Sequence, residues 1–256
     1  MEFDAVILAG GRSSRLGGVP KAGLMVDGAT LLGWALRAAR AARRIVVVGP
    51  VAGDLPPGVL GCREDPPFSG PAAAIAAGVF ALSTYGSAEQ AAAGQAPAAQ
   101  GFGAPGTDGL PARPASEAPA PLTLVLACDM PRVAGAVAAL LEAAAEDPDG
   151  DPTGARDGLV AVSADGRTQP LVGLYGTAAL QHAVADAARR NALEGGSVFA
   201  LLASLELRTI PVPPGSTDDV DTWDDASALG AASPGPGTSG ALRPNSTLEA
   251  NGEKPG

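Results

Sequence analysis

Short apolar runs alternate along most of the chain with longer segments rich in alanine and leucine. The continuous or β-branched runs predict buried strands at residues 5–8, 45–48, 60–64, 122–127, 158–163, 170–175 and 205–212. The segments between them predict helices at residues 72–82, 133–145, 177–190 and 198–203, an earlier helix capped by Thr30, and a last helix capped within 218–225. Strand and helix alternating in this way predict an α/β fold with a mostly parallel sheet and helices on both faces.

Two segments interrupt or follow this pattern. Residues 84–121 consist largely of Ala, Gly, Pro, Gln and Ser, and residues 231–256 are similarly poor in large apolar side chains. Neither composition can bury enough apolar surface to offset the entropy lost on ordering. We therefore predict one domain over residues 1–230, interrupted by a disordered insertion at about 84–121 and followed by a disordered tail.

Composition narrows the classes of partner. Hydrophobic residues make up 46% of the chain but aromatic residues only 4%, so aliphatic side chains must fill the core. The 27 acidic residues outnumber the 17 basic ones, which disfavours nucleic acid as a partner. The start of the chain is acidic and no apolar run reaches the 18 residues needed to cross a bilayer, so we expect no signal peptide, no membrane partner and a cytoplasmic location.

Isolated residues of reactive types receive structural interpretations. Cys62 and Cys128 lack a metal-ligand spacing, and neither needs a functional role. His182 stands alone in a predicted helix, which favours a structural role. The arginines of the segment 37–44 are interpreted as helix-end and surface charges.

The strongest chemical signal is the segment 6–21, VILAGGRSSRLGGVPK. A buried strand breaks there at paired glycines, whose backbone can turn sharply and present N–H groups to an anion. Arg15 and Lys21 then place cationic side chains on the same loop. The pattern fits neither a P-loop nor a dinucleotide fingerprint. It predicts phosphate binding, and the alternative is a structural loop with solvated charges.

Asp129 directly follows the predicted strand 122–127 and precedes Met130-Pro131. A carboxylate fixed at the end of a strand is a suitable Mg²⁺ ligand, because Mg²⁺ takes only one or two protein carboxylates and fills its other positions with water and phosphate oxygens. The alternative is that Asp129 caps the following helix. Ligands of parallel sheets bind at the carboxyl ends of the strands, so the glycine loop and Asp129 are expected to face the same crevice.

The loop resembles the signature of the molybdenum cofactor guanylyltransferase group of nucleotidyltransferases, Leu-Ala-Gly-Gly-x-x-x-Arg-Met-Gly-Gly followed by a lysine. Leu16 replaces the methionine, and Cys128-Asp129-Met130-Pro131 is similar to the metal-binding motif of that group. The resemblance covers residues 3–229 except the insertion. It implies a Rossmann-like fold of the nucleotide-diphospho-sugar transferase type.

The resemblance also implies roles for individual residues. Arg15, Lys21 and Asp129 would be catalytic, and Asp129 would hold Mg²⁺. Nucleotide-binding residues would be Leu8, Ala9, Gly10, Gly11, Lys21, Asp65 and Asp129. Two departures weaken the match: Gly49-Pro50 stands where the family often has an asparagine, and Trp223 replaces a proline in the closing segment 219–225. Asp221 of that segment could approach the metal or the acceptor, but helix capping explains its aspartates nearly as well.

The activity implied by the resemblance is transfer of GMP from Mg-GTP to the terminal phosphate of molybdopterin or its molybdenum form, with release of pyrophosphate. It further implies transient contact with molybdenum cofactor enzymes or their chaperones. Two alternatives stay open. One is cytidylyl or other nucleotidyl transfer to a different phosphorylated acceptor, and the other is a non-catalytic module that binds a nucleotide or cofactor.

Overall fold

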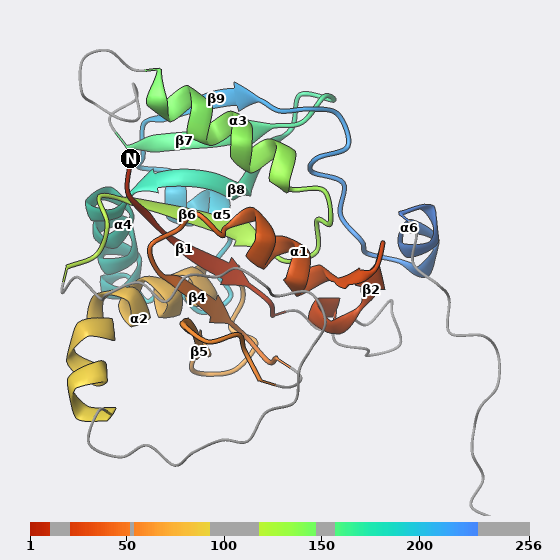
Figure 1. The fold of residues 1–256 in the computed structure, drawn as a ribbon. Coiled ribbons are helices and arrows are strands. Elements are labelled where there is room, and N and C mark those ends of the chain that lie inside the picture. The colour runs from red at the N-terminus through yellow and green to blue at the C-terminus, as the bar shows by residue number, and fades with distance from the viewer. Residues whose placement is uncertain (11–20, 52–53, 93–117, 147–156, 230–256) are drawn as a thin grey trace, which may run out of the picture.

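A seven-stranded sheet forms the centre of the fold (Figure 1), and its strand order is β5-β4-β1-β6-β8-β7-β9. The structure is a computed structural model that describes residues 1–10, 21–51, 54–92, 118–146 and 157–229. The strands are β1 (Phe3–Leu8), β4 (Ile45–Val48), β5 (Val59–Cys62), β6 (Leu122–Ala127), β7 (Gly158–Val162), β8 (Thr168–Gly176) and β9 (Leu207–Pro211). Only β8 is antiparallel to its neighbours, which confirms the mostly parallel sheet expected from the apolar runs.

Helices cover both faces of this sheet. Helices α1 (Leu31–Ala38) and α3 (Ala134–Ala145) pack on one face, while α2 (Pro71–Ala92), α4 (Thr177–Arg189) and α5 (Val198–Leu202) pack on the other. Alternate side chains of β1 pack into different layers: Ile7 packs with α1 and α3, whereas Val6 packs with α2. The predicted core of aliphatic side chains is therefore confirmed, and it is divided between two layers.

A small subdomain of short elements lies beside the first helix. Strands β2 (Met25–Val26) and β3 (Ala29–Thr30) form a two-stranded sheet, and α6 (Trp223–Ala228) follows the last long loop. The buried side chain of Val220 packs with Leu24, Val26 and Leu31 in one small apolar cluster. This cluster fixes the C-terminal segment against the residues that follow the glycine loop.

Two local signals, a helix cap and a hairpin turn, behave as predicted. The Thr30 side chain accepts a hydrogen bond from the backbone N–H of Gly33 and thereby caps α1. The strands on either side of Asp165-Gly166 pair as an antiparallel hairpin. Each of these features depends on residues close in sequence.

The arginine-rich segment differs from the expectation. Arg44 is only 4% exposed, and its guanidinium donates hydrogen bonds to the backbone carbonyls of Leu82 and Ala118. Arg43 pairs with the fully buried Asp4 at 3.4 Å and also donates to Ala118. The interpretation of these two arginines as surface charges was wrong, because the chain before β6 returns across them and supplies carbonyl acceptors.

The edges of the predicted insertion are also more ordered than expected. Helix α2 continues to Ala92 rather than ending near residue 82. At the other edge, the backbone N–H of Ala120 donates to the carboxylate of Asp4 at 2.8 Å. The central part of the predicted insertion, residues 93–117, and the predicted tail at 231–256 lie outside the described residues.

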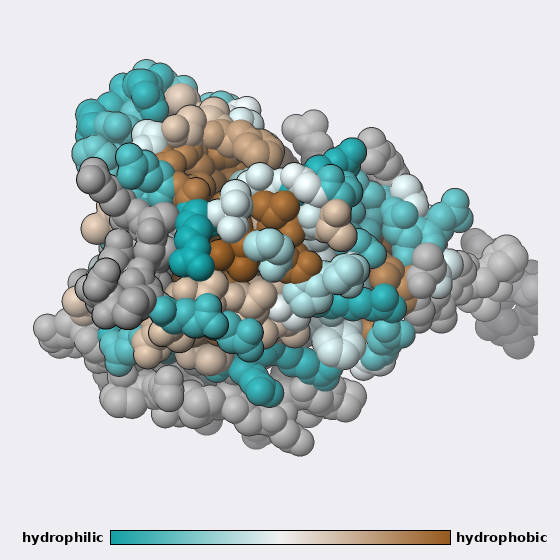
Figure 2. All heavy atoms as spheres, turned by 90° about the horizontal axis from the view of Figure 1, so that it is seen from above, coloured by the Kyte–Doolittle hydropathy of each residue, from teal (hydrophilic) through white to brown (hydrophobic). Residues whose placement is uncertain are grey.

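Figure 2 shows the molecule from above, with hydrophilic residues over much of this face and hydrophobic residues gathered near its middle. Among the residues that the structure describes, no helix has both the length and the apolar character needed to cross a membrane.

Candidate functional site

The carboxyl ends of β1 and β6 lie side by side at the centre of the sheet. Leu8 pairs with Ala127, so the chain leaves both strands at the same level. Backbone pairing continues past the strand ends, because the Cys128 N–H donates to the Leu8 carbonyl at 3.0 Å. Strands β4 and β6 flank β1 on opposite sides, and such a reversal of strand order opens a crevice that binds ligands in α/β sheets.

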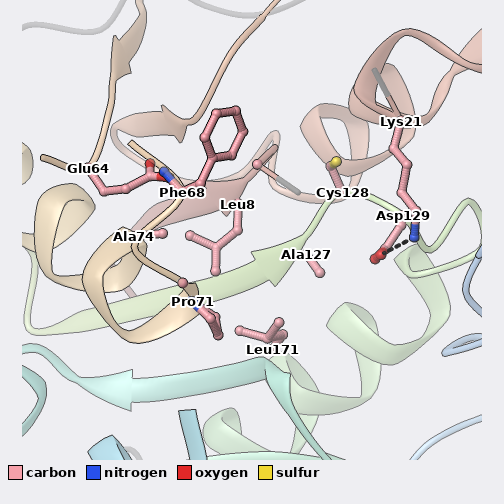
Figure 3. A pocket seen from close by; sticks show the side chains of 12 residues that line it. Leu8, Lys21, Glu64, Phe68, Pro71, Ala74, Ala127, Cys128, Asp129 and Leu171 are labelled. Atoms are coloured by element: carbon pink, nitrogen blue, oxygen red, sulfur yellow. Dashed lines mark hydrogen bonds and ion pairs between the residues drawn. The ribbon is translucent and has the colours of Figure 1, made fainter. Parts of the chain in front are cut away.

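A cavity of about 300 Å³ occupies this crevice. Its size matches common small-molecule sites. Apolar side chains and glycines form most of its wall, with charged groups at Lys21, Glu64 and Asp129; the lining residues are Leu8, Gly10, Lys21, Glu64, Phe68, Gly70, Pro71, Ala74, Ala127, Cys128, Asp129 and Leu171. Figure 3 shows Lys21 and Asp129 at one end and Glu64 and Phe68 at the other. The expectation that the glycine loop and Asp129 face one crevice is thus met by Gly10 and Asp129.

The glycine that follows β4 explains how the loops approach so closely. Gly49 has a φ of +124°, and a Cβ added to it would lie 2.6 Å from the backbone nitrogen of Gly10. Only glycine fits this position. The departure from the family's asparagine therefore coincides with tight backbone packing between Gly49 and Gly10.

Three carboxylates gather at the charged end of the cavity. Asp129, Asp219 and Asp221 each offer an oxygen, and these oxygens lie within 4.8 Å of one another. Lys21 pairs with two of them, at 3.3 Å from Asp129 and in direct contact with Asp221. Carboxylate oxygens are the ligands that Mg²⁺ prefers, so this donor set fits the divalent cation expected from the sequence.

Electrostatics couple the members of this cluster. Burial lowers the pKa of Lys21, but its contacts with Asp221 and Asp129 outweigh this effect and leave the pKa raised. The pKa of Asp219 is raised by burial and by the neighbouring charges of Asp221 and Asp129. Three carboxylates beside one ammonium group leave this end of the cavity with a net negative charge, which favours the binding of a cation.

The segment 219–225 owes its position to a helix cap and a backbone contact. Thr222 and Asp225 form a capping box at the start of α6, and the Asp225 carboxylate also accepts from the Asp221 N–H at 3.1 Å. The Val220 N–H donates to the Asp129 carbonyl at 3.0 Å, which joins this segment to the end of β6. Within this segment Asp225 caps α6, whereas Asp221 contacts Lys21.

Asp129 is not a helix cap. The N-cap position of α3 is Val133, and among the described residues no side-chain hydrogen bond caps that helix. The capping alternative for Asp129 was therefore wrong. Sequence reasoning left Asp221 outside the predicted metal ligands and did not propose Asp219, although the resemblance of the segment 219–225 to the family's closing motif was the available signal.

The remaining predicted site residues have different placements. Leu8 and Gly10 line the cavity, whereas Ala9 is buried and its N–H donates to Val48 at 2.8 Å. Asp65 is exposed and does not line the cavity, so its nucleotide contact stays a prediction. Gly11 and Arg15 lie outside the described residues.

Sequence analysis missed Glu64, which lines the cavity in place of its neighbour Asp65. The side chain of Glu64 is buried, and its Oε1 accepts from the Phe68 N–H at 2.9 Å. Both residues lie in the loop after β5, whose conformation buries Glu64 and exposes Asp65, and the sequence did not determine which of the two carboxylates faces inward.

Neither cysteine behaves as a reactive thiol. Burial, with a smaller contribution from Glu64, raises the pKa of Cys62 to about 11. Burial and the nearby Asp129 raise the pKa of Cys128 to about 12. Both thiols stay protonated at neutral pH, and His182 is exposed on α4 near Asp186 and does not line the cavity.

An α/β sheet with a charged cavity at its central strand ends has the architecture of a protein that binds a small ligand at the switch point of the strand order. Residues 5–205 match the MobA-like NTP transferase domain, and the chain belongs to that family.

Solved structures have the same fold. Molybdopterin-guanine dinucleotide biosynthesis protein A from Archaeoglobus fulgidus is 16% identical, with a TM-score of 0.52 and coverage of 89% of this chain and 96% of that protein. 2-C-methyl-D-erythritol 4-phosphate cytidylyltransferase from Thermus thermophilus is 23% identical, with a TM-score of 0.52 and coverage of 90% of this chain and 97% of that protein. These identities establish the fold alone. No curated protein gives a significant match.

Proposed function

We propose that the protein transfers GMP from Mg-GTP to the terminal phosphate of molybdopterin, or of its molybdenum form, and releases pyrophosphate. The observation that carries this proposal is a cavity with an apolar wall and a charged end, formed beside the glycine loop of a MobA-like NTP transferase. An apolar wall suits a base and sugar, and a lysine beside carboxylates suits a metal-bound polyphosphate. The resemblance of the motifs to guanylyltransferases supports the choice of nucleotide and acceptor.

The carboxylates of Asp129 and Asp221 would hold Mg²⁺, with Asp219 beside them. When bound, the cation supplies charge neutralisation for phosphate oxygens. Lys21 supplies a fixed ammonium at the same end of the cavity, and its raised pKa keeps it protonated at neutral pH. Arg15 and the N–H groups at Gly10 and Gly11 would stabilise charge on the departing pyrophosphate.

The acceptor needs no general base from the protein. A phosphate monoester has a second pKa of about 6, so it is mostly ionised at neutral pH and can attack directly. No histidine lines the cavity, which agrees with a reaction that depends on positioning and charge.

The test is pyrophosphate release from each of the four NTPs with Mg²⁺, with and without molybdopterin. Release that requires both GTP and molybdopterin is the expected result. Release with CTP would favour the cytidylyl alternative. No release and no nucleotide binding would contradict the assignment of this cavity as a nucleotidyltransferase site.

A further inference from the structure

Strand β8 diverges from β6 where the two strands reach the cavity. Their pairing ends at Leu126 and Val172, and the residues that come next in this ladder, Ala127 and Leu171, both line the cavity. Figure 3 shows Leu171 between the two ends of the cavity. The gap between two central strands therefore gives the cavity one of its apolar walls.

A bulge on the other edge of β8 accompanies this divergence. Val160 of β7 pairs with Gly173, but its successor Ala161 pairs with Gln169, so residues 170–172 have no partner in β7. Leu171 lies inside this bulge and packs against the apolar clusters on both faces of the sheet, whereas a regular strand would direct it to one face only. Bulges next to sites commonly redirect a side chain in this way.

Tyr175 holds the bulge in this shape. Its side chain is fully buried, and its hydroxyl donates a hydrogen bond to the Pro170 carbonyl at 2.7 Å. Five residues of a regular antiparallel strand span about 17 Å, which is farther than a tyrosine side chain reaches. The hydrogen bond therefore forms only because the bulge shortens the strand between these two residues.

Gly173 provides the room for this contact. Alternate residues of a strand share a face, so position 173 lies on the same face as the Tyr175 ring. A Cβ added to Gly173 would overlap with the hydroxyl oxygen of Tyr175 and with the ring carbon that carries it. The ring thus fills the space that a side chain at position 173 would take, and its hydroxyl is directed to Pro170.

We propose that Tyr175 is a positioning residue for nucleotide binding, because its hydrogen bond to Pro170 holds Leu171 against the nucleoside of the bound nucleotide. This inference rests on the proposed function, in which the triphosphate lies at the Lys21 end of the cavity. The apolar wall that Leu171 extends is then left for the sugar and base. Tyr175 does not itself line the cavity, so it acts on the nucleotide only through the backbone of the bulge.

The substitution Tyr175→Phe removes the hydroxyl and keeps the buried ring. Without the hydrogen bond the bulge relaxes, and Leu171 loses its fixed position in the wall. Thr123→Val is the matched control, because Thr123 pairs with Tyr175 in the sheet and its hydroxyl is hydrogen-bonded to that of Thr177 at 2.8 Å. Each variant loses one buried hydrogen bond and should show a Tm lower by about 2–4 °C, but only Tyr175→Phe disturbs the bulge.

The first measurement is equilibrium binding of Mg-GTP and of magnesium tripolyphosphate. Tyr175→Phe should weaken Mg-GTP binding by about three- to tenfold, which corresponds to the apolar contact of one to two CH₂ groups, and should leave tripolyphosphate binding within about twofold. The KM for GTP should rise by the same factor while kcat stays nearly parental, because the Lys21 end of the cavity is unchanged. Thr123→Val should keep the parental affinity for both ligands.

A double-mutant cycle tests whether Tyr175 acts through Leu171. Leu171→Ala should itself weaken Mg-GTP binding by about tenfold or more. In that background, adding Tyr175→Phe should change the affinity by less than about twofold, because the side chain that Tyr175 positions is already absent. A second, independent loss of affinity would overturn the inference.

Three further results would overturn it. These are parental Mg-GTP affinity in a folded Tyr175→Phe, an equal loss of tripolyphosphate affinity, and a rise in KM for the acceptor alone, which would place the acceptor at this wall. If the parent bound no nucleotide, the proposed function would fail as well. Should Tyr175→Phe unfold, the methyl NMR signals of Leu171 in the parent, assigned with Leu171→Ala, decide. They should shift with Mg-GTP and not with magnesium tripolyphosphate, and unshifted signals would overturn the inference.

Discussion

Replacing Asp129 with asparagine should separate its catalytic role from any contribution to stability. Asparagine preserves the size of the side chain and removes its charge. Asp129 caps no helix, and the interaction that the substitution weakens is the ion pair with Lys21 at 3.3 Å. A partly exposed pair of this kind contributes about 0.2–1 kcal/mol to the free energy of unfolding.

A second effect on stability has the opposite sign. The carboxylate oxygens of Asp129, Asp219 and Asp221 lie within 4.8 Å of one another, so removing one negative charge relieves repulsion in the cluster. The two effects offset each other, and the net change in the free energy of unfolding should stay under about 1 kcal/mol. For a domain of this size that corresponds to a shift of about 2–4 °C in Tm.

The effect on turnover should be much larger. Loss of a metal ligand and its charge removes roughly 3–4 kcal/mol of transition-state stabilisation, which is about a 10²- to 10³-fold decrease in kcat. The assay is pyrophosphate release as a function of Mg²⁺ concentration, with melting curves for both proteins. Asp186→Asn, on the surface of α4, is the matched control and should retain parental turnover. Parental turnover and Mg²⁺ dependence in Asp129→Asn would refute the metal-ligand role.

Three further predictions test other parts of the molecule. Lys21→Ala should lower kcat, raise KM for GTP and destabilise the metal-free protein, because three neighbouring carboxylates lose the ammonium group of Lys21. Parental kinetics in this variant would show that the loop is structural. Replacing residues 93–117 with a short Gly-Ser linker should leave Tm and turnover nearly unchanged, whereas also deleting 118–120 should lower Tm by several degrees, since the buried Arg44 loses a carbonyl acceptor. Cys128 should react with iodoacetamide at pH 8 about 10³-fold more slowly than a free thiol, because its pKa of about 12 leaves little thiolate at that pH. The rate should increase as the pH rises toward this pKa. Labelling is followed by mass spectrometry, and rapid labelling of the folded protein would contradict the prediction.

Much of the fold could be predicted from the sequence because its signals are local. The continuous apolar runs at 45–48 and 122–127 indicate strands covered on both faces, and both are buried strands of the parallel part of the sheet. The cap at Thr30 and the turn at Asp165-Gly166 depend on residues close to one another in the chain. The end of a helix without a strong stop signal was less predictable, and α2 extends to Ala92.

The candidate site was only partly predictable. The position of Asp129 directly after a core strand placed its carboxylate at the ligand-binding edge, because the carboxyl ends of parallel strands meet there. Local pattern could not choose between Glu64 and Asp65, since the loop after β5 decides which of the two carboxylates is buried. It also could not show that Arg44 is buried, because its carbonyl acceptors come from distant segments of the chain.

The sequence by itself thus determined the order and type of the main elements and the glycine loop at the first strand end. These follow from hydrophobic periodicity and backbone preferences over a few residues. Tertiary structure decided which charged groups meet: Lys21, Asp129 and Asp221 are separated by about a hundred residues each and converge only when β1 pairs with β6 and the segment after β9 packs beside β6. Strand register and loop packing set the distances between such side chains, and these depend on contacts across the whole domain.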